Sequence, residues 1–235
     1  RDPDVDLLRR LKAASGGLVK LVSVAPELPG AIEFIEAVGE EVTVSLAHTT
    51  ADYDTATRAF RAGARQVTHL FNAMPPFSHR APGVVGAAFD SECKVELICD
   101  GVHIHPSVVR AVFQLFGARR VILISDTMRA AGMPDGDYTL GGQAVQVKGK
   151  YATLEDGTLA GSVTDLMSCM KTAVSFGIPL EDAVLAAAVN PAQAIGIYSR
   201  VGSIEPGKLA NLAVLDEHLE LKAVMCLGEV VGGSL

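Results

Sequence analysis

The sequence predicts an α/β fold in which a parallel sheet carries helices on both faces. Five short apolar runs are spaced along residues 18–125, and segments with helical spacing separate most of them. The runs are continuously apolar, as in strands that are buried on both faces. A polar or ionisable residue follows each run, and the carboxyl edge of a parallel sheet is where such folds hold their active sites.

The expected elements follow one another along the chain. The apolar runs predict strands at Leu18–Ala25, Glu41–Ala47, Arg65–Leu70, Lys94–Cys99 and Arg120–Ser125. Helical spacing predicts helices at Gly30–Val38, Asp52–Ala62 and Pro106–Leu115, with glycines closing the last two.

The pattern changes after Asp126. Met133–Tyr151 is rich in glycine and in alternating residues, which predicts a loop and a hairpin. Ser162 is expected to cap a helix that runs to Phe176, with Asp165 completing a capping box. The remaining expected elements are a helix at Leu180–Val189 and strands of a small β layer at Leu209–Leu215 and Leu221–Leu227.

Composition excludes several classes of function. The chain has 235 residues, of which 49% are hydrophobic and 20% charged, and its net charge is −7. This acidic balance disfavours nucleic-acid and membrane partners, and no apolar run approaches the roughly 20 residues of a membrane helix. The four cysteines lack C-x-x-C and zinc-finger spacing, so we expect reduced, buried thiols in a cytoplasmic protein.

Three successive strand ends carry residue types that metal ions prefer. These residues are Glu27, His48 and His69, and neighbouring strand ends of a barrel lie side by side. A carboxylate and two imidazoles suit a divalent ion such as Zn²⁺ or Fe²⁺, and three protein ligands leave a position open for catalysis. A single histidine is more often a core or loop residue, so the prediction depends on the joint placement.

Asp126 ends the fifth expected strand. A Ser-Asp pair in this position is commonly a turn or helix cap. The alternative is a carboxylate that faces the metal, takes a proton from water and passes it to a leaving amine.

Other loops could bind a ligand. Backbone N–H groups around Asn72 and Ala73, with Arg80 beyond them, would form a phosphate or carboxylate cradle, although a loop arginine is usually only solvated. His103 could donate a hydrogen bond to a substrate, whereas His105 has the place of a helix-start residue. Gly157–Ser162 is a glycine-bounded turn that could wall a pocket or simply lead into a helix.

These stretches resemble the N-acetylglucosamine-6-phosphate deacetylase family of the amidohydrolase superfamily. The matching segments are Val24–Glu27, Ser45–Thr50, Thr68–Met74, Arg80–Gly83, Asp100–His103, Ser125–Asp126, Gly157–Ser162 and Asn190–Ala192. The stretch THLFNAM at Thr68–Met74 is the most specific of them, whereas the tail Gly202–Asp216 is typical of the wider superfamily.

The resemblance implies a TIM-like (β/α)8 metal-dependent hydrolase barrel over residues 1–200, with strands of a small β-sandwich over 201–235. It implies hydrolysis of N-acetylglucosamine 6-phosphate to glucosamine 6-phosphate and acetate, in amino-sugar catabolism and cell-wall recycling, by a cytoplasmic homodimer. Glu27, His48 and His69 would bind the divalent metal, with Zn²⁺ preferred and Fe²⁺ or Mn²⁺ also compatible, and Asp126 would be the general base and acid. The implied substrate-binding residues are Asn72, Ala73, Arg80, Asp100, Gly101, Val102, His103, Leu159, Ala160 and Gly161.

The sequence departs from the family mainly at its front. The first half of the small β layer, the first barrel strand with its His-x-Glu-Gly-Pro motif and a loop with another substrate-binding histidine have no counterpart here. Five or six strands cannot close an eight-stranded barrel. We therefore expect a barrel that is incomplete at its N-terminal side, formed by the C-terminal portion of a longer chain, with an open and poorly stable sheet edge.

Two other functions compete with this interpretation. Another metal-dependent amidohydrolase, acting on a cyclic amide or an N-acyl amino acid, would not need Arg80 or Asn72 to bind its substrate. A catalytically dead barrel kept for assembly would bind no metal, despite Glu27, His48 and His69.

Overall fold

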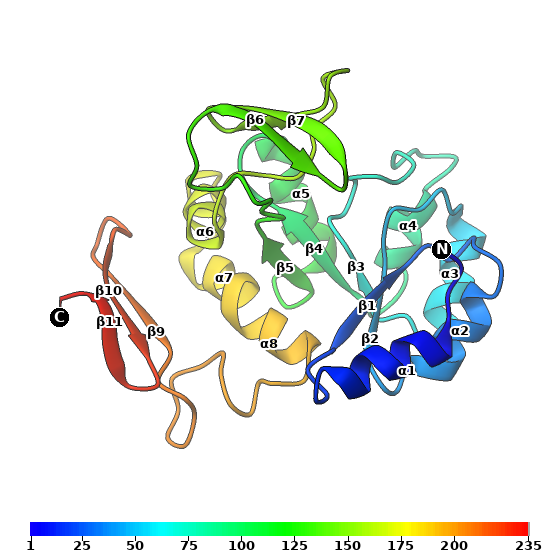
Figure 1. Cartoon of the computed structure of the whole chain (residues 1–235), viewed down its shortest axis with the longest axis horizontal. Helices are drawn as coiled ribbons and strands as arrows, with labels where there is room; N and C mark the ends of the chain where they lie inside the picture. The colour runs from blue at the N-terminus through cyan, green and yellow to red at the C-terminus, as the bar shows by residue number, and fades with distance from the viewer. Residues whose placement is uncertain (235) are drawn as a thin grey trace.

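A five-stranded parallel sheet forms the centre of the computed structural model, which describes residues 1–234 (Figure 1). The strands pair in chain order, and all four neighbouring pairs are parallel. They are β1 (Leu21–Val24), β2 (Thr43–Leu46), β3 (Gln66–Val67), β4 (Lys94–Ile98) and β5 (Val121–Ile124). Within residues 1–234, β1 and β5 are the outer strands and do not pair with each other, so the sheet is open. This confirms the α/β fold and agrees with an incomplete barrel.

Helix α1 (Val5–Ala14) precedes the first strand, and four helices connect the strands of this sheet. These are α2 (Ala31–Val38), α3 (Tyr53–Ala62), α4 (Gly83–Phe89) and α5 (Pro106–Phe116). The predictions of α2, α3 and α5 are confirmed, and His105 caps α5 by accepting a hydrogen bond from the N–H of Ser107. The sequence analysis did not predict α1 or α4. In α4 the sequence GVVGAAF is buried nearly all round, so it lacks the polar face that reveals a helix.

The second half of the chain adds two small antiparallel sheets and a run of helices. The first sheet consists of β6 (Gly136–Leu140), β7 (Gln143–Lys148) and β8 (Tyr151–Thr153). The helices that follow are α6 (Leu166–Ser175), α7 (Leu180–Val184), the π-helix η1 (Leu185–Val189) and α8 (Asn190–Ala194). The second sheet consists of β9 (Leu212–Leu215), β10 (Leu221–Cys226) and β11 (Glu229–Gly233). Figure 1 shows β9–β11 apart from the parallel sheet, beyond α6 and α7. The predicted hairpin and C-terminal β layer are therefore confirmed, whereas the division into domains at residue 200 stays a prediction.

Three predictions about local structure were wrong. The third strand is much shorter than Arg65–Leu70, because the chain enters left-handed backbone at His69. Ser162 does not cap α6: the cap is Asp165, whose side chain accepts a hydrogen bond from the N–H of Ser168 at 2.8 Å. Cys226 is exposed rather than buried, whereas the other three cysteines are buried, and all four are free thiols.

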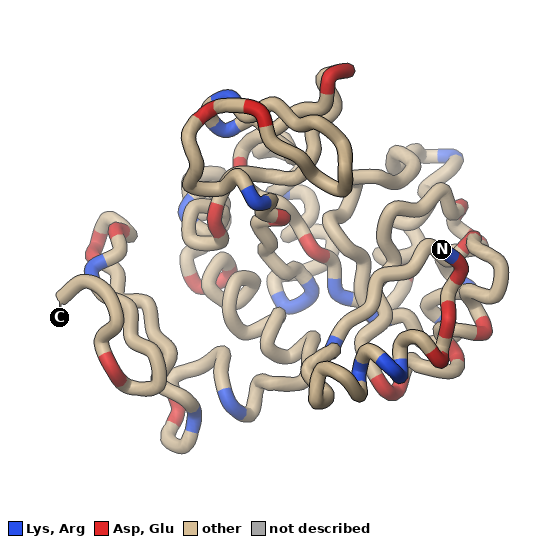
Figure 2. Tube along the Cα trace, in the orientation of Figure 1, with Lys and Arg blue, Asp and Glu red and all other residues tan. Residues whose placement is uncertain are grey.

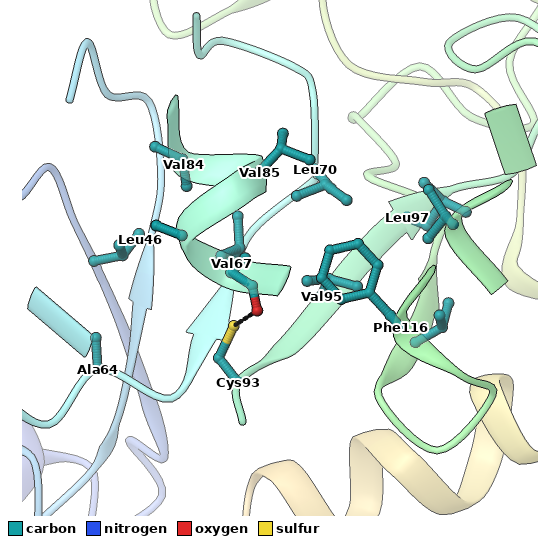
Figure 3. Close-up of a cluster of buried hydrophobic side chains, with 14 of the residues drawn as sticks. Leu46, Ala64, Val67, Leu70, Val84, Val85, Cys93, Val95, Leu97 and Phe116 are labelled. Carbon is teal, nitrogen blue, oxygen red and sulfur yellow. Dashed lines mark hydrogen bonds between the residues drawn. The ribbon is translucent and has the colours of Figure 1, made fainter. Parts of the chain in front are cut away.

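The main core lies between the parallel sheet and its helices. Figure 3 shows the strand residues Leu46 and Val67 near Val84 and Val85 of α4, with Leu97 of β4 farther along the same cluster. All five side chains are essentially inaccessible to solvent, and burying each aliphatic side chain contributes about 1.5–3 kcal/mol. This packing holds the sheet, and with it the carboxyl ends of its strands, in a fixed position.

Charged residues lie mostly outside this core. Figure 2 shows acidic and basic residues interspersed along α1–α3 and over β6–β8. Arg9 on α1 pairs with Glu41, just before β2, at 2.6 Å, and Lys12 donates to the Glu41 carbonyl at 2.9 Å. These contacts fasten α1 beside α2 and the start of β2. No helix within residues 1–234 has both the length and the apolar character that crossing a membrane requires.

Asn190 fastens the C-terminal helices to β5. Its buried amide donates to the carbonyls of Ala118 at 2.7 Å and Val121 at 2.6 Å. We expect Asn190→Ala to lower the free energy of unfolding by about 2 kcal/mol, because two carbonyls lose their donor. Urea unfolding measures this change, with the exposed Gln193→Ala on the same helix as the control. Equal, small losses for both variants would show that the amide is not a structural tie.

Candidate active site

Three ionisable residues at strand ends share an unusual backbone conformation. His48 follows β2 with φ of 46°, His69 follows β3 with φ of 33°, and Asp126 follows β5 with φ of 49°. Such left-handed conformations are uncommon for residues other than glycine, cost about 1–3 kcal/mol each, and cluster at functional sites. Two of the three residues predicted to converge, His48 and His69, therefore share this strained backbone with Asp126, whereas Glu27 does not.

The structure brings the two histidines into contact. Their Nε2 atoms lie 3.0 Å apart and their rings meet edge to face, with centroids 4.7 Å apart. Burial and the neighbouring His48 lower the pKa of His69, so the neutral ring with an available lone pair is favoured. Two imidazole nitrogens turned toward one point are a donor set that suits a borderline divalent ion. The histidine pair therefore fits the predicted metal.

Glu27 is hydrogen-bonded to the two residues that follow His48. Its carboxylate accepts hydrogen bonds from the N–H of Thr50 at 2.6 Å and from the hydroxyl of Thr49 at 2.5 Å. Burial opposes ionisation of Glu27, but these hydrogen bonds outweigh it and lower the pKa of the carboxyl. Within the described part of the chain, no three His, Cys, Asp or Glu side chains are grouped as a metal site. Glu27 is thus tied to the residues after His48 without joining the histidines in a three-ligand group.

Asp126 is exposed and lies close enough to influence the buried His69 and the half-buried Glu96. Its negative charge favours the protonated forms of both His69 and Glu96. Glu96, on β4, lines a cavity of about 360 Å³ together with Gln66 and Asp126. Burial raises the pKa of Glu96 to about 6, although the Gln66 amide donates to its carboxylate. The sequence analysis missed Glu96; the available signal was a carboxylate inside the apolar run KVELIC.

The loop after β3 packs against the end of β2. The Asn72 amide donates to the carbonyl of His69 at 3.3 Å, and the N–H of Thr49 donates to the carbonyl of Ala73 at 3.0 Å. Ala73 itself has a left-handed φ of 50°. Arg80 is exposed in the loop that follows. The structure therefore places Asn72 and Ala73 beside the histidine pair, with Arg80 farther along the same connection.

Asp100 and His103 form a compact turn after β4. One Asp100 oxygen accepts the N–H groups of Val102 and His103 at 2.8 and 2.9 Å, and the other contacts Nδ1 of the His103 ring at 2.7 Å. Burial raises the pKa of Asp100, but these bonds more than compensate and lower it. Gly101 adopts a φ of +75°, which a side chain would strain. Since Nδ1 of His103 is bonded to Asp100, Nε2 is the nitrogen free to meet a ligand.

The last predicted segment runs beside Asp126. Leu159 bridges to Thr153 on β8, and the N–H of Ala160 donates to the carbonyl of Ala152 at 3.0 Å. A Cβ added to Gly161 would lie 3.3 Å from the Asp126 carbonyl oxygen. The small sheet thus brings this segment, predicted from the sequence as a pocket wall, next to the candidate base.

Comparisons with known protein families and curated sequences agree with one another. A profile described as "Amidohydrolase family" matches residues 5–231. The N-acetylglucosamine-6-phosphate deacetylase of Bacillus subtilis is 40% identical over 233 residues, which cover 98% of this chain and 59% of the relative. The N-acetylgalactosamine-6-phosphate deacetylase of Escherichia coli O157:H7 is 35% identical over 233 residues, covering 98% and 62%.

Solved structures agree with the sequence relatives. A mutant N-acetyl-D-glucosamine-6-phosphate deacetylase from Mycobacterium smegmatis, in complex with N-acetyl-D-glucosamine-6-phosphate, superposes with a TM-score of 0.93 at 39% identity, covering 98% of this chain and 62% of its own. A beta-aspartyl dipeptidase from Fervidobacterium islandicum AW-1, 13% identical, has a TM-score of 0.59 over 90% of this chain and 57% of its own, and shares the fold alone. This chain spans about three fifths of the length of the curated relatives named above.

Proposed function

This chain belongs to the amidohydrolase family, and from that premise we propose that it hydrolyses the acetamide of N-acetylglucosamine 6-phosphate to acetate and glucosamine 6-phosphate. The proposal depends most on the left-handed backbone of His48, His69 and Asp126 at the carboxyl ends of β2, β3 and β5, with the two histidine rings in contact. The names of the relatives at 35–40% identity support the choice of an N-acetylated amino-sugar phosphate.

Glu27, His48 and His69 would hold a divalent metal ion, with Zn²⁺ preferred and Fe²⁺ or Mn²⁺ compatible with the same ligands. The histidine pair supports this assignment, and Glu27, which is bonded to Thr49 just after His48, would complete the ligand set. When bound, such an ion supplies a Lewis acid that polarises a carbonyl and lowers the pKa of water.

Asp126 would move the proton in this reaction. Its carboxylate accepts a proton from the attacking water as the new C–O bond forms, and returns that proton to the amine nitrogen as the C–N bond breaks. Its exposure and its proximity to His69 suit this role, because the carboxylate must reach water and substrate in turn.

The loops around this centre would bind the sugar phosphate. Asn72, Ala73 and Arg80 would hold the phosphate through an amide, a backbone N–H and a guanidinium. The turn Asp100–His103 and the segment Leu159–Gly161 would line the sugar pocket. Nε2 of His103 would face a substrate hydroxyl or carbonyl, since Nδ1 is held by Asp100.

A panel of substrates tests this function. Acetate release should be fastest with N-acetylglucosamine 6-phosphate and much slower with unphosphorylated N-acetylglucosamine. N-acetylgalactosamine 6-phosphate belongs in the same panel, because a relative named for that activity is 35% identical. Turnover of a cyclic amide or an N-acyl amino acid by the metal-loaded protein, with no acetate from any sugar, would favour the alternative amidohydrolase.

Arg80→Ala is expected to raise KM for the phosphorylated sugar by about 10- to 100-fold, which corresponds to losing one hydrogen bond to a charged group. KM for the unphosphorylated sugar should not change. Initial-rate kinetics with both sugars measure the difference, and Arg61→Ala, an exposed arginine on α3, is the matched control. Equal effects on both sugars, or no effect, would remove Arg80 from the phosphate site.

We also propose a cellular compartment and an oligomeric state for the enzyme. Three buried free thiols, Cys93, Cys99 and Cys169, support a reducing compartment such as the cytoplasm. A homodimer follows from the family resemblance, and light scattering on the purified full-length protein would measure its mass directly.

A further inference from the structure

We propose that Ser162 is a positioning residue for Asp126, and that Gly161 and Ser162 hold the Asp126 backbone in its left-handed conformation. This inference rests on the proposed function, in which Asp126 moves the proton. Ser162 is buried with only 1% of its surface exposed, although its predicted role as a helix cap falls to Asp165. The hydroxyl and backbone groups of Ser162 therefore have a role other than capping α6.

Ser162 binds the chain on both sides of Asp126. Its N–H donates to the Asp126 carbonyl at 2.9 Å, and its hydroxyl donates to the Ser125 carbonyl. Its own carbonyl accepts the N–H of Met128 at 2.9 Å, and Thr127 and Ser162 form an isolated parallel bridge. The contacts thus continue two residues beyond Asp126, to Met128.

The two carbonyls that Ser162 binds are those that define the Asp126 backbone. Ser125 O belongs to the peptide plane before the Asp126 Cα, and Asp126 O belongs to the plane after it. Fixing both planes fixes φ and ψ of Asp126, which has an unfavourable φ of 49°. The exposed Asp126 carboxylate cannot hold that conformation by packing, so the restraint comes through the backbone.

Gly161 permits this close approach. Its φ is +68°, and an added Cβ would lie 3.3 Å from the Asp126 carbonyl oxygen and 3.5 Å from Cβ of Met128. Gly157, four residues earlier, has a similar φ of +85° but nothing within 4 Å of an added Cβ. The two glycines therefore share a backbone requirement, and only Gly161 touches the Asp126 turn.

The sheet β6–β8 also supports the contact between Asp126 and Ser162. It has its own apolar cluster, separate from the main core, formed by Met128, Ala130, Val145, Val147, Ala152 and Ala160. Met128 lies two residues after Asp126, and Ala160 lies two residues before Ser162. The cluster therefore packs together the two chain segments that meet at Asp126 and Ser162.

Ser162→Ala tests the inference in the purified full-length protein. It removes the hydroxyl bond to Ser125 and should lower kcat about 10- to 100-fold, the scale expected for a small misplacement of a reacting group. KM and metal content should stay within about twofold, since the residues that hold substrate and metal are untouched. Ser162→Thr retains the hydroxyl and should recover most of kcat. Ser168→Ala, which loses a hydroxyl contact to Asp165 at 2.8 Å, is the matched control and should leave kcat unchanged.

Substitutions of Gly161 and Gly157 test the inference without changing the Ser162 hydroxyl. Gly161→Ala should lower kcat, because the new methyl presses on the Asp126 carbonyl. Gly157→Ala carries the same backbone penalty in open space and should leave kcat within about twofold. Equal effects of the two substitutions would overturn the proposed role of Gly161.

Hydrogen exchange separates this inference from the proposed function. In Ser162→Ala, amide exchange over residues 126–128 should become faster than in wild type, whatever the substrate is. If wild type releases no acetate from the sugar phosphate, the proposed function fails, and the exchange result still tests the contact. If wild type is active, and Ser162→Ala keeps kcat within twofold with unchanged exchange, the positioning role is wrong.

Discussion

Replacing Asp126 with asparagine is expected to lower kcat by about 10³-fold, within the range that a general acid–base contributes. The amide has nearly the same shape as the carboxylate but cannot take a proton from water. Metal content and KM should remain close to wild type, because Asp126 is proposed to bind neither the ion nor the phosphate. The loss should therefore fall on the chemical step alone.

Steady-state kinetics and elemental analysis of the same samples measure this effect. Asp137→Asn, at an exposed position on β6, is the matched control and should behave as wild type. If Asp126→Asn kept kcat within tenfold of wild type, Asp126 would not be the proton carrier. If it instead lost its metal, the carboxylate would have to be counted among the ligands.

Replacing His69 with alanine is expected to abolish acetate release by removing the metal. His69 is 4% exposed, and its Nε2 lies 3.0 Å from that of His48. The substitution therefore removes one of the two nitrogen ligands proposed for the metal. Loss of an outer partner of a metal ligand costs about 10- to 100-fold in affinity, and loss of a ligand itself should cost more. His48→Ala should behave in the same way.

Metal content after dialysis, measured beside acetate release, tests this directly. His218→Ala is the control, since His218 is highly exposed in the turn between β9 and β10. Treating wild type with a chelator should stop acetate release, and adding Zn²⁺ or Mn²⁺ should restore it. Full metal content in His69→Ala would show that the histidine pair is not the metal site.

The positions of the strand ends could be predicted because buried parallel strands are continuously apolar and break off at polar residues. The same breaks in the apolar runs single out Glu27, His48, His69 and Asp126 as candidate site residues, independently of any family resemblance. The length of β3 could not be predicted. His69, Phe71 and Ala73 all adopt positive φ, and apolar character reports burial rather than backbone conformation.

The remaining differences depend on contacts between distant residues. Ser162 and Asp165 are both good N-cap residues, and the choice between them is decided by the bonds of Ser162 to Ser125 and Asp126, 36 or more residues earlier in the chain. The bonds of Glu27 to Thr49 and Thr50 are likewise set by the packing of β1 against β2. Local sequence patterns contain no information about such pairs.

Asp126 is proposed to activate water for attack on the acetamide, and a single turnover in H₂¹⁸O follows the oxygen of that water into the product. With protein in excess over N-acetylglucosamine 6-phosphate, the released acetate should carry one ¹⁸O atom and the sugar product none. Unlabelled acetate with ¹⁸O in the Asp126 carboxyl would mean that the carboxylate attacks the amide itself. Intact substrate in a fully metal-loaded sample would contradict the deacetylase function altogether.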